Sequence, residues 1–255
     1  MIFIKDVSKH FEGKEVLKGL DLHIPRGETV VVMGRSGCGK SVLLKLITGL
    51  MKPDQGEIWF DGMEISKLKL KAFNQIRQRI GMLFQSAALF DSMTVAENVG
   101  FMLDRHTNQS RKKIQKIVSE KLELVDLAGT QDLKPAELSG GMRKRVGLAR
   151  AIALDPEVIL YDEPTTGLDP MTRIEIDHLI RNLHDKLQVT SVVVTHDMES
   201  AFFVGTHVAM IHDGKIVAIG TPDEIRRNNN PIVRNFISPN DEHHTELDKS
   251  PELPS

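Results

Sequence analysis

The sequence contains a glycine-rich segment at residues 34–41, between the apolar run Thr29 to Met33 and a helical stretch from Val42 to Gly49. It matches the pattern G-x-x-x-x-G-K-[ST], in which backbone N–H groups surround phosphate oxygens at the start of a helix. Lys40 could reach terminal phosphates and Ser41 could ligate Mg²⁺. The flanking strand and helix argue against an ordinary glycine-rich turn. The segment therefore predicts a phosphate-binding loop made of Gly34, Arg35, Ser36, Gly37, Cys38, Gly39, Lys40 and Ser41.

Two adjacent carboxylates follow a second apolar run, Val158 to Tyr161. Asp162 and Glu163 would lie at the carboxyl end of that strand, facing the phosphate loop. There, Asp162 suits a place near Mg²⁺, and Glu163 suits a general base that deprotonates a water molecule. Taken alone, the pair could be the start of a solvated loop. Beside a phosphate loop it predicts a hydrolytic site.

A third segment, residues 138–142, reads Leu-Ser-Gly-Gly-Met and precedes the helical stretch Arg143 to Ala153. Ser139 is a good N-cap, and Gly140 and Gly141 would expose backbone N–H groups at the helix N-terminus. An ordinary capped helix is the alternative interpretation. In a chain that also has a phosphate loop, the segment predicts a second phosphate-binding surface.

Short apolar runs recur between helical stretches and predict the strands that hold these segments. Such runs, alternating with helices, favour an α/β fold with a mostly parallel sheet buried on both faces. The strands are expected at Thr29 to Met33, Glu57 to Phe60, Val158 to Tyr161, Ser191 to Thr195 and Val208 to Ile211.

Two other stretches follow different patterns. Residues 2–11 and 16–24 alternate apolar and polar side chains, which predicts an N-terminal antiparallel β layer. Residues 86–140 predict a helical insertion, and the basic residues at 111–116 are expected to form a solvated face of it.

The C-terminal part predicts a short helix and then a tail. Thr221, Pro222 and Glu224 supply an N-cap, a first-turn proline and a capping-box glutamate. Residues 1–237 are expected to form one domain. Residues 238–255 are acidic and contain proline, which predicts a disordered or partner-ordered tail.

Composition limits the class of protein. The chain has 33 Lys and Arg against 35 Asp and Glu, and its net charge of -2 gives no support to a nucleic-acid binder recognised by bulk charge. Its single cysteine excludes an intrachain disulfide, and the N-terminus does not resemble a signal peptide, so we expect a cytosolic protein. No apolar run approaches the ~20 residues of a membrane-spanning helix, so any role at a membrane would be exercised from outside the bilayer.

The order of these segments along the chain, from residue 2 to about 237, resembles the ATP-binding-cassette (ABC) ATPases. The resemblance implies a P-loop NTPase of ABC type that binds ATP and Mg²⁺ and hydrolyses ATP at Glu163. It implies that Ser41, Gln85 and Asp162 lie around Mg²⁺. It further implies adenine stacking by Phe11, γ-phosphate contacts by Gln85 and His196, an intersubunit contact by Asp169, and contacts of Ser139, Gly140 and Gly141 with the ATP of a second subunit.

Two sequence segments indicate which branch of the ABC ATPases the chain resembles. Met142 stands where the most common family string has Gln, beyond the segment expected to meet phosphate. This chain's residues 138–146 and its segment from Phe84 to Asn98 are similar to those of the branch that works with Mce-domain proteins in bacterial lipid traffic. This likeness implies phospholipid transport between membranes, maintaining outer-membrane lipid asymmetry, by a peripheral homodimer at the cytoplasmic face of the inner membrane. The implied partners are an integral-membrane permease, an Mce-domain lipid-binding protein and a small accessory cytoplasmic subunit, and no nucleic acid.

Other functions stay open from the sequence. An ABC ATPase of another importer or exporter would carry the same motifs. A soluble ABC ATPase acting on nucleic acid or ribosomes would usually carry two cassettes, or a coiled-coil or zinc-binding insertion, and none is visible. A nucleotide-binding regulator without turnover is opposed by Glu163 and His196. Residues 85–99, rich in Leu, Phe and Met, are the expected dock for a permease helix, unless they pack within the helical insertion.

Overall fold

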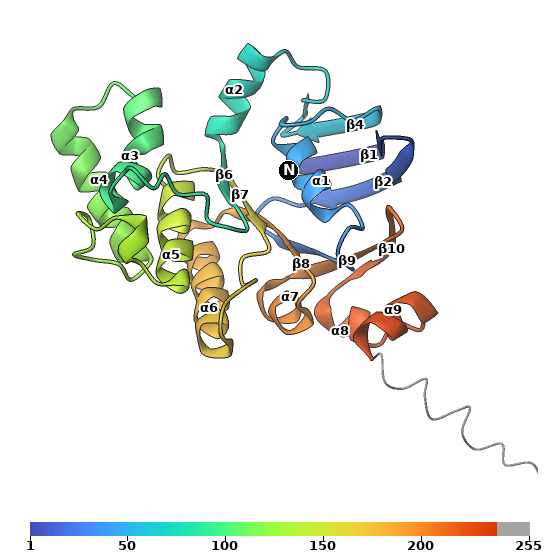
Figure 1. Cartoon of the computed structure of the whole chain (residues 1–255). Coiled ribbons are helices and arrows are strands. Elements are labelled where there is room, and N and C mark those ends of the chain that lie inside the picture. The colour runs from blue at the N-terminus through green and yellow to red at the C-terminus, as the bar shows by residue number, and fades with distance from the viewer. Residues whose placement is uncertain (239–255) are drawn as a thin grey trace, which may run out of the picture.

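The computed structural model describes residues 1–238, and its centre is a six-stranded sheet with the strand order β10-β9-β3-β8-β7-β6 (Figure 1). Neighbouring strands pair in parallel, except that β10 is antiparallel to β9. The mostly parallel sheet is therefore confirmed, and β6 and β10 add to the strands expected from the sequence. The strands are β3 (Thr29–Met33), β6 (Ile80–Leu83), β7 (Val158–Asp162), β8 (Thr190–Thr195), β9 (His207–His212) and β10 (Lys215–Gly220).

The helices cover this sheet and form a lobe to one side of it (Figure 1). They are α1 (Lys40–Ile47), α2 (Leu70–Gln78), α3 (Val95–His106), α4 (Arg111–Leu124), α5 (Gly140–Ala151), α6 (Pro170–Leu187), α7 (Met198–Val204), α8 (Pro222–Arg226) and α9 (Pro231–Ile237), with a 3-10 turn η1 (Pro135–Glu137) before α5.

Side chains of the central strands alternate between two hydrophobic clusters, because successive residues of a strand point to opposite faces. In β3, Val31 and Met33 join the cluster that contains residues of α3, α5 and α6. Val30 and Val32 join the cluster that contains residues of α1 and the N-terminal strands. Every residue of β3, β7 and β8 is buried, which explains why these strands read as continuous apolar runs.

A second sheet, in the order β2-β1-β4-β5, is antiparallel throughout and confirms the predicted N-terminal β layer. The expected place of residues 57–60 in the parallel sheet is wrong, because they belong to β4, where Ile58 pairs with Ile4 of β1. In β4 only Ile58 and Phe60 are buried, as is typical of a strand with one covered face. The strands are β1 (Ile2–Phe11), β2 (Lys14–Ile24), β4 (Gln55–Phe60) and β5 (Met63–Glu64).

The lobe between β6 and β7 is helical, as the sequence predicts. Thr94 and Glu97 form a capping box at the start of α3, and the Ser110 hydroxyl caps α4. The basic side chains of α4 form a solvated face, since Arg111, Lys112, Lys113 and Lys116 are all exposed.

The C-terminal elements also follow their sequence signals. Thr221 caps α8, and the capping box with Glu224 is present. Of the predicted tail, residues 239–255 lie outside the described residues. Within residues 1–238, no helix is long and apolar enough to cross a membrane.

Candidate active site

The phosphate-loop segment connects β3 to α1 at the carboxyl edge of the central sheet. Gly39 is the N-cap of α1 and adopts a left-handed conformation, with φ of 108°. A Cβ atom at Gly39 would lie 2.6 Å from Leu17 Cδ2, and one at Gly34 would lie 2.4 Å from the carbonyl oxygen of Ile211. Both positions therefore need glycine, because any side chain would collide with β2 or β9.

A cavity of about 280 Å³ lies over this loop. It brings together the loop and the residues that follow β6, β7 and β8, at the carboxyl ends of parallel strands where ligands bind open α/β sheets. Its lining contains Val16, Ser36, Gly37, Gly39, Lys40, Ser41, Val42, Gln85, Glu163 and His196.

Lys40 and Ser41 connect the loop to the acidic pair. The buried ammonium of Lys40 donates hydrogen bonds to the carbonyl oxygens of Gly34 (2.7 Å) and Arg35 (3.2 Å). It also lies 3.5 Å from Oε1 of Glu163. The Ser41 hydroxyl donates to Oδ1 of Asp162 at 2.9 Å. The start of α1 is thus joined to the end of β7 by an ion pair and a hydrogen bond.

The Glu163 carboxylate lies between Lys40 and His196. Its Oε2 is 2.8 Å from Nδ1 of His196 and accepts a hydrogen bond from the Thr166 hydroxyl at 3.1 Å. The residue is buried and has a left-handed φ of 48°. Its backbone N–H donates to the Val194 carbonyl on β8 at 2.9 Å. A carboxylate fixed in this way can accept a proton from a water molecule in the cavity.

Burial shifts the ionisation of groups around the cavity. It raises the pKa of Asp162, although the hydrogen bond from Ser41 acts in the opposite direction. Burial also raises the pKa of the Cys38 thiol. It lowers the pKa of the Lys144 ammonium to about 8, against the attraction of Asp162 and Glu163. The raised pKa of Asp162 indicates a carboxylate whose charged form an added cation would stabilise.

The Leu138–Met142 segment does not line this cavity in a single chain. Ser139 caps α5 by accepting a hydrogen bond from the Met142 backbone N–H at 3.2 Å. Gly140 and Gly141 form the first turn of α5, and a Cβ atom at Gly141 would lie 2.5 Å from Thr172 Cγ2. The N-cap predicted from the sequence is confirmed, while the phosphate contact stays a prediction.

Asp169 and Phe11 also lie outside the cavity lining. Asp169 caps α6 and accepts a hydrogen bond from the Thr172 hydroxyl at 2.6 Å. Phe11 is 36% exposed at the end of β1, with the Lys9 ammonium 5.6 Å from its ring centroid. Among the described residues, the structure brings neither side chain to the loop, and their roles stay predictions.

The sequence model of the ABC transporter family matches residues 17–166, more than half of the chain. The chain belongs to this family.

Relatives of this ABC protein carry two different functional names. The chain is 41% identical over 237 residues to the "Intermembrane phospholipid transport system ATP-binding protein MlaF" of Haemophilus influenzae, covering 93% of this chain and 90% of the relative. It is 40% identical over 237 residues to the "Probable ribonucleotide transport ATP-binding protein mkl" of Mycobacterium leprae, covering 93% of this chain and 68% of the relative.

A solved ABC cassette shares the fold. The chain is similar, with a TM-score of 0.80 and 35% identity, to the dimeric cassette MJ0796 in a post-hydrolysis state bound to ADP and Pi. The match covers 87% of this chain and 99% of MJ0796. This ABC protein binds ATP and is an ATPase, as the sequence predicts.

Besides Val42 in the cavity lining, three residues at the site of this ABC ATPase were not predicted from the sequence. Val16 lines the cavity from β2, and Thr166 contacts Glu163. The buried Lys144 donates hydrogen bonds to the carbonyl oxygens of Gln85 and Glu163. Val16 and Lys144 reach the site only through the fold, because they come from distant segments. Thr166 lies just three residues after Glu163, a local spacing that could have indicated it.

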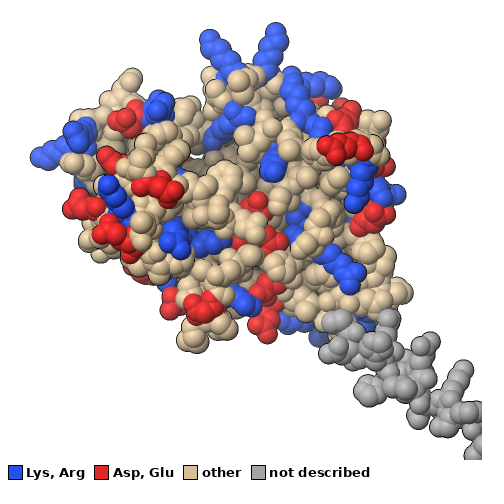
Figure 2. Space-filling view, in the orientation of Figure 1, with Lys and Arg blue, Asp and Glu red and all other residues tan. Residues whose placement is uncertain are grey.

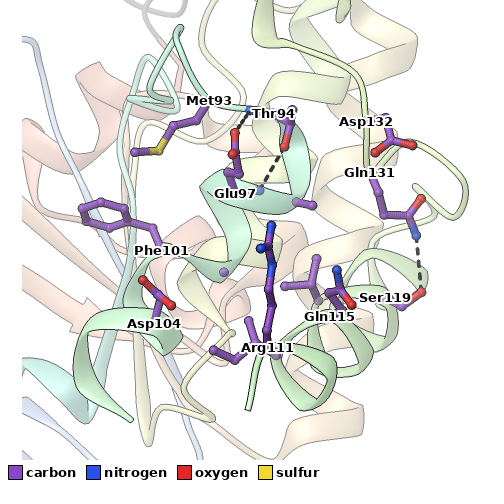
Figure 3. A pocket seen from close by; sticks show the side chains of 14 residues that line it. Met93, Thr94, Glu97, Phe101, Asp104, Arg111, Gln115, Ser119, Gln131 and Asp132 are labelled. Atoms are coloured by element: carbon purple, nitrogen blue, oxygen red, sulfur yellow. Dashed lines mark hydrogen bonds between the residues drawn. The ribbon is translucent and has the colours of Figure 1, made fainter. Parts of the chain in front are cut away.

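A larger cavity, of about 850 Å³, lies in the helical lobe between α3 and α4 (Figure 3). Arg111, Gln115 and Asp104 line it, and the Gln131 amide donates to the Ser119 hydroxyl at its edge. None of the predicted site residues is in its lining. Its size therefore does not make it the active site, which lies where the phosphate loop and the acidic pair meet.

The cavity over the loop has donor atoms that suit Mg²⁺. This cation prefers oxygen ligands and usually keeps several water molecules, so few protein groups are needed. Ser41 and Asp162 lie side by side, and Gln85 faces the same cavity. Among residues 1–238, no group of three or more His, Cys, Asp or Glu could hold a metal by itself. The donors therefore fit an ion that also binds nucleotide phosphates and water.

Proposed function

We propose that this ABC ATPase is the ATP-hydrolysing subunit of a bacterial transporter that moves phospholipid between membranes and maintains outer-membrane lipid asymmetry. The observation that carries the proposal is the 41% identity with MlaF of Haemophilus influenzae across nearly the whole of both chains. A 42% identity with MlaF of Escherichia coli, again over 93% of this chain, supports it.

In this proposal the catalytic groups are those at the ends of β3, β6, β7 and β8. Lys40 and the loop N–H groups hold the β- and γ-phosphates. Glu163 orients the attacking water and removes its proton. His196 contacts the γ-phosphate and, through its 2.8 Å contact with Oε2, keeps the Glu163 carboxylate directed toward the water.

Mg²⁺ belongs to the same proposal, with Ser41, Asp162 and Gln85 as the residues around it. When bound, the ion would neutralise charge on the transferring phosphoryl group. The chain's own part is to keep the Ser41 hydroxyl and the Asp162 carboxylate 2.9 Å apart. Phe11 is proposed to stack on the adenine.

The working unit is proposed to be a homodimer. Ser139, Gly140, Gly141 and Asp169 lie outside the chain's own nucleotide cavity. A second copy could present its Leu138–Met142 segment to the ATP bound over the first copy's phosphate loop, closing the dimer until hydrolysis releases it. The similarity to a cassette described as dimeric, with ADP and Pi, supports this arrangement.

A groove between α2 and the helical lobe is the proposed dock for a permease helix. Figure 2 shows the surface hollowed between these parts, and the groove has a volume of about 450 Å³. Phe90 and Phe101 line it, with ring centroids 4.8 Å apart, and so does Phe84, the neighbour of Gln85. A helix seated there would move the backbone before Gln85.

Only part of the predicted dock at residues 85–99 faces the groove, and the rest packs inside the helical lobe. Phe90 is 43% exposed in the groove, whereas Val95 and Val99 are fully buried in the core of the lobe. Further partners proposed are an Mce-domain protein and a small accessory cytoplasmic subunit. The assembly would hold this chain at the cytoplasmic face of the inner membrane as a peripheral subunit, without nucleic acid.

The proposal is tested by reconstituting the chain with the permease and Mce-domain protein of the same genome in liposomes. We expect ATP-dependent transfer of a fluorescent phospholipid to acceptor vesicles, and loss of transfer with Glu163→Gln. Hydrolysis stimulated by ribonucleotides but not by phospholipid would contradict the proposal and favour the function named for the mycobacterial relative. Hydrolysis that depends on ribosomes or DNA would indicate a soluble ABC ATPase instead.

A further inference from the structure

One buried cation on α5 contacts both backbone segments that carry the proposed catalytic groups. Lys144 is 5% exposed, and its ammonium donates hydrogen bonds to the carbonyl oxygens of Gln85 (2.6 Å) and Glu163 (3.1 Å). Both acceptors are backbone atoms, so the ammonium fixes the course of the chain while the Gln85 and Glu163 side chains face the cavity.

Two further residues of α5 contact the segment that follows Gln85. Gly147 comes three positions after Lys144, and Arg150 three positions after Gly147, so each is a neighbour of the next on the helix surface. Arg150 donates to the carbonyl oxygens of Ala87 and Ala88, both at 2.6 Å. A Cβ atom at Gly147 would lie 2.8 Å from Leu83 Cδ1 and 3.3 Å from Cβ of Ala87, so glycine permits this close approach.

The held segments have unfavourable backbone conformations. Ala87 (φ 61°), Ala88 (φ 48°) and Glu163 (φ 48°) all lie in the left-handed region, which costs energy for residues other than glycine. Such conformations persist only where surrounding contacts hold them. Removing the Lys144 ammonium would therefore allow the backbone at Gln85 and Glu163 to relax and move their side chains.

The other end of α5 carries the Leu138–Met142 segment. Ser139 is the N-cap and Lys144 lies little more than one helical turn beyond it, so a displacement at the N-terminus of α5 reaches the ammonium directly. We infer that Lys144 is a positioning residue that couples the Leu138–Met142 segment to Gln85 and Glu163 of its own chain. ATP held by the phosphate loop of one chain contacts the Leu138–Met142 segment of the other chain. It thereby organises Gln85 and Glu163 of that other chain. This inference rests on the dimer proposed above.

The first test is Lys144→Met, which keeps most of the side-chain length and removes the ammonium. We expect the Kd for ATP to stay within about twofold, while kcat falls about 10- to 100-fold, as expected for a lost charge-assisted hydrogen bond. The Hill coefficient for ATP hydrolysis should fall toward 1. Lys144→Arg should restore part of both values, and Lys112→Met on the exposed face of α4 serves as the matched control.

Two results would overturn the inference. One is a Lys144→Met variant with wild-type kcat and Hill coefficient. The other is loss of ATP binding in parallel with kcat, which indicates general damage to the fold. Should Lys144→Met not fold, Lys144→Gln, which keeps a hydrogen-bond donor on a shorter side chain, is assayed in the same way. Hydrolysis is measured without lipid, so a failure of phospholipid transport leaves this test intact.

Mixed dimers distinguish coupling within one chain from damage to the Leu138–Met142 surface. In the first dimer, a Lys144→Met chain is paired with a Glu163→Gln chain, so the only complete catalytic set belongs to the chain without Lys144. In the second, a wild-type chain is paired with the double variant. We expect slow hydrolysis in the first dimer and faster hydrolysis in the second. Equal rates, or a slower second dimer, would overturn the inference.

Discussion

Replacing Glu163 by glutamine tests the assignment of the general base most directly. The substitution keeps the size of the side chain and removes its charge and its basicity. A positioned general base contributes about 10²- to 10⁴-fold to a rate. We therefore expect turnover to fall by that factor, which corresponds to a barrier higher by about 3–5 kcal/mol.

The contacts of Glu163 predict that ATP binding survives this change. Its Oε1 lies 3.5 Å from the Lys40 ammonium, so the carboxylate competes with phosphate oxygens for that cation. Glutamine removes the competing charge, while the amide can still contact His196 and Thr166, which lie 2.8 Å and 3.1 Å from Oε2. ATP affinity should therefore be equal to or higher than that of the wild type, and an ATP-bound dimer should accumulate.

The assay combines steady-state phosphate release at saturating Mg-ATP, equilibrium binding of a fluorescent ATP analogue, and size-exclusion chromatography with ATP. Glu123→Gln on α4 is the matched control, because that carboxylate is exposed in the helical lobe. Turnover of Glu163→Gln within about threefold of wild type would refute the assignment. Loss of ATP binding would refute the reasoning about Lys40.

Lys40→Ala should weaken ATP binding about 10- to 100-fold, since it removes a charge-assisted hydrogen bond to phosphate; equilibrium titration measures this, and unchanged affinity would contradict the loop assignment. Asp177 is buried and accepts a hydrogen bond from the Ser200 hydroxyl, and burial raises its pKa to about 6. Because this folded-state pKa lies above the ordinary value of 3.8, the folded protein loses stability as pH rises from about 4 to about 6, by up to about 3 kcal/mol. Asp177→Asn should therefore melt several degrees above wild type at pH 7.5, with a smaller difference at pH 5, and a pH-independent difference would contradict this explanation. Cys38 is half-buried and its thiol has a raised pKa, so a maleimide should react with it slowly at pH 7 and more slowly with Mg-ATP present. The attached maleimide should abolish ATP hydrolysis, which mass spectrometry with activity assays would follow. A fully alkylated chain that still hydrolyses ATP would exclude nucleotide binding over the loop.

The phosphate loop and the caps could be predicted because their signals are local. Gly39 and Lys40 are neighbours in the chain, and their spacing is enough to specify a left-handed turn followed by a helix. Ser139 and Thr221 cap helices through backbone N–H groups three residues ahead, which again needs only a short segment. The acidic pair was found because it directly follows a buried apolar strand.

The sequence did not assign every apolar run to the correct sheet. Residues 57–60 have a partly apolar sequence that either sheet could accept, and the choice depends on pairing with β1, more than 50 residues away. The same limit applies to β6, whose Gly81 lies so close to α5 that a Cβ atom would be 2.3 Å from the carbonyl oxygen of Ala151. Periodicity along the chain contains no information about such distant neighbours.

The sequence by itself determined the family, the phosphate loop and the chemical types of the catalytic groups, because these depend on residue identity and short spacing. Only the tertiary structure decided which side chains meet. It placed Glu163 between Lys40 and His196, although Lys40 begins α1 and the other two follow β7 and β8. It also buried Lys144, to which the sequence assigned no role, against two distant carbonyl groups. Burial and contact depend on packing between segments far apart in the chain, and packing is a property of the whole fold.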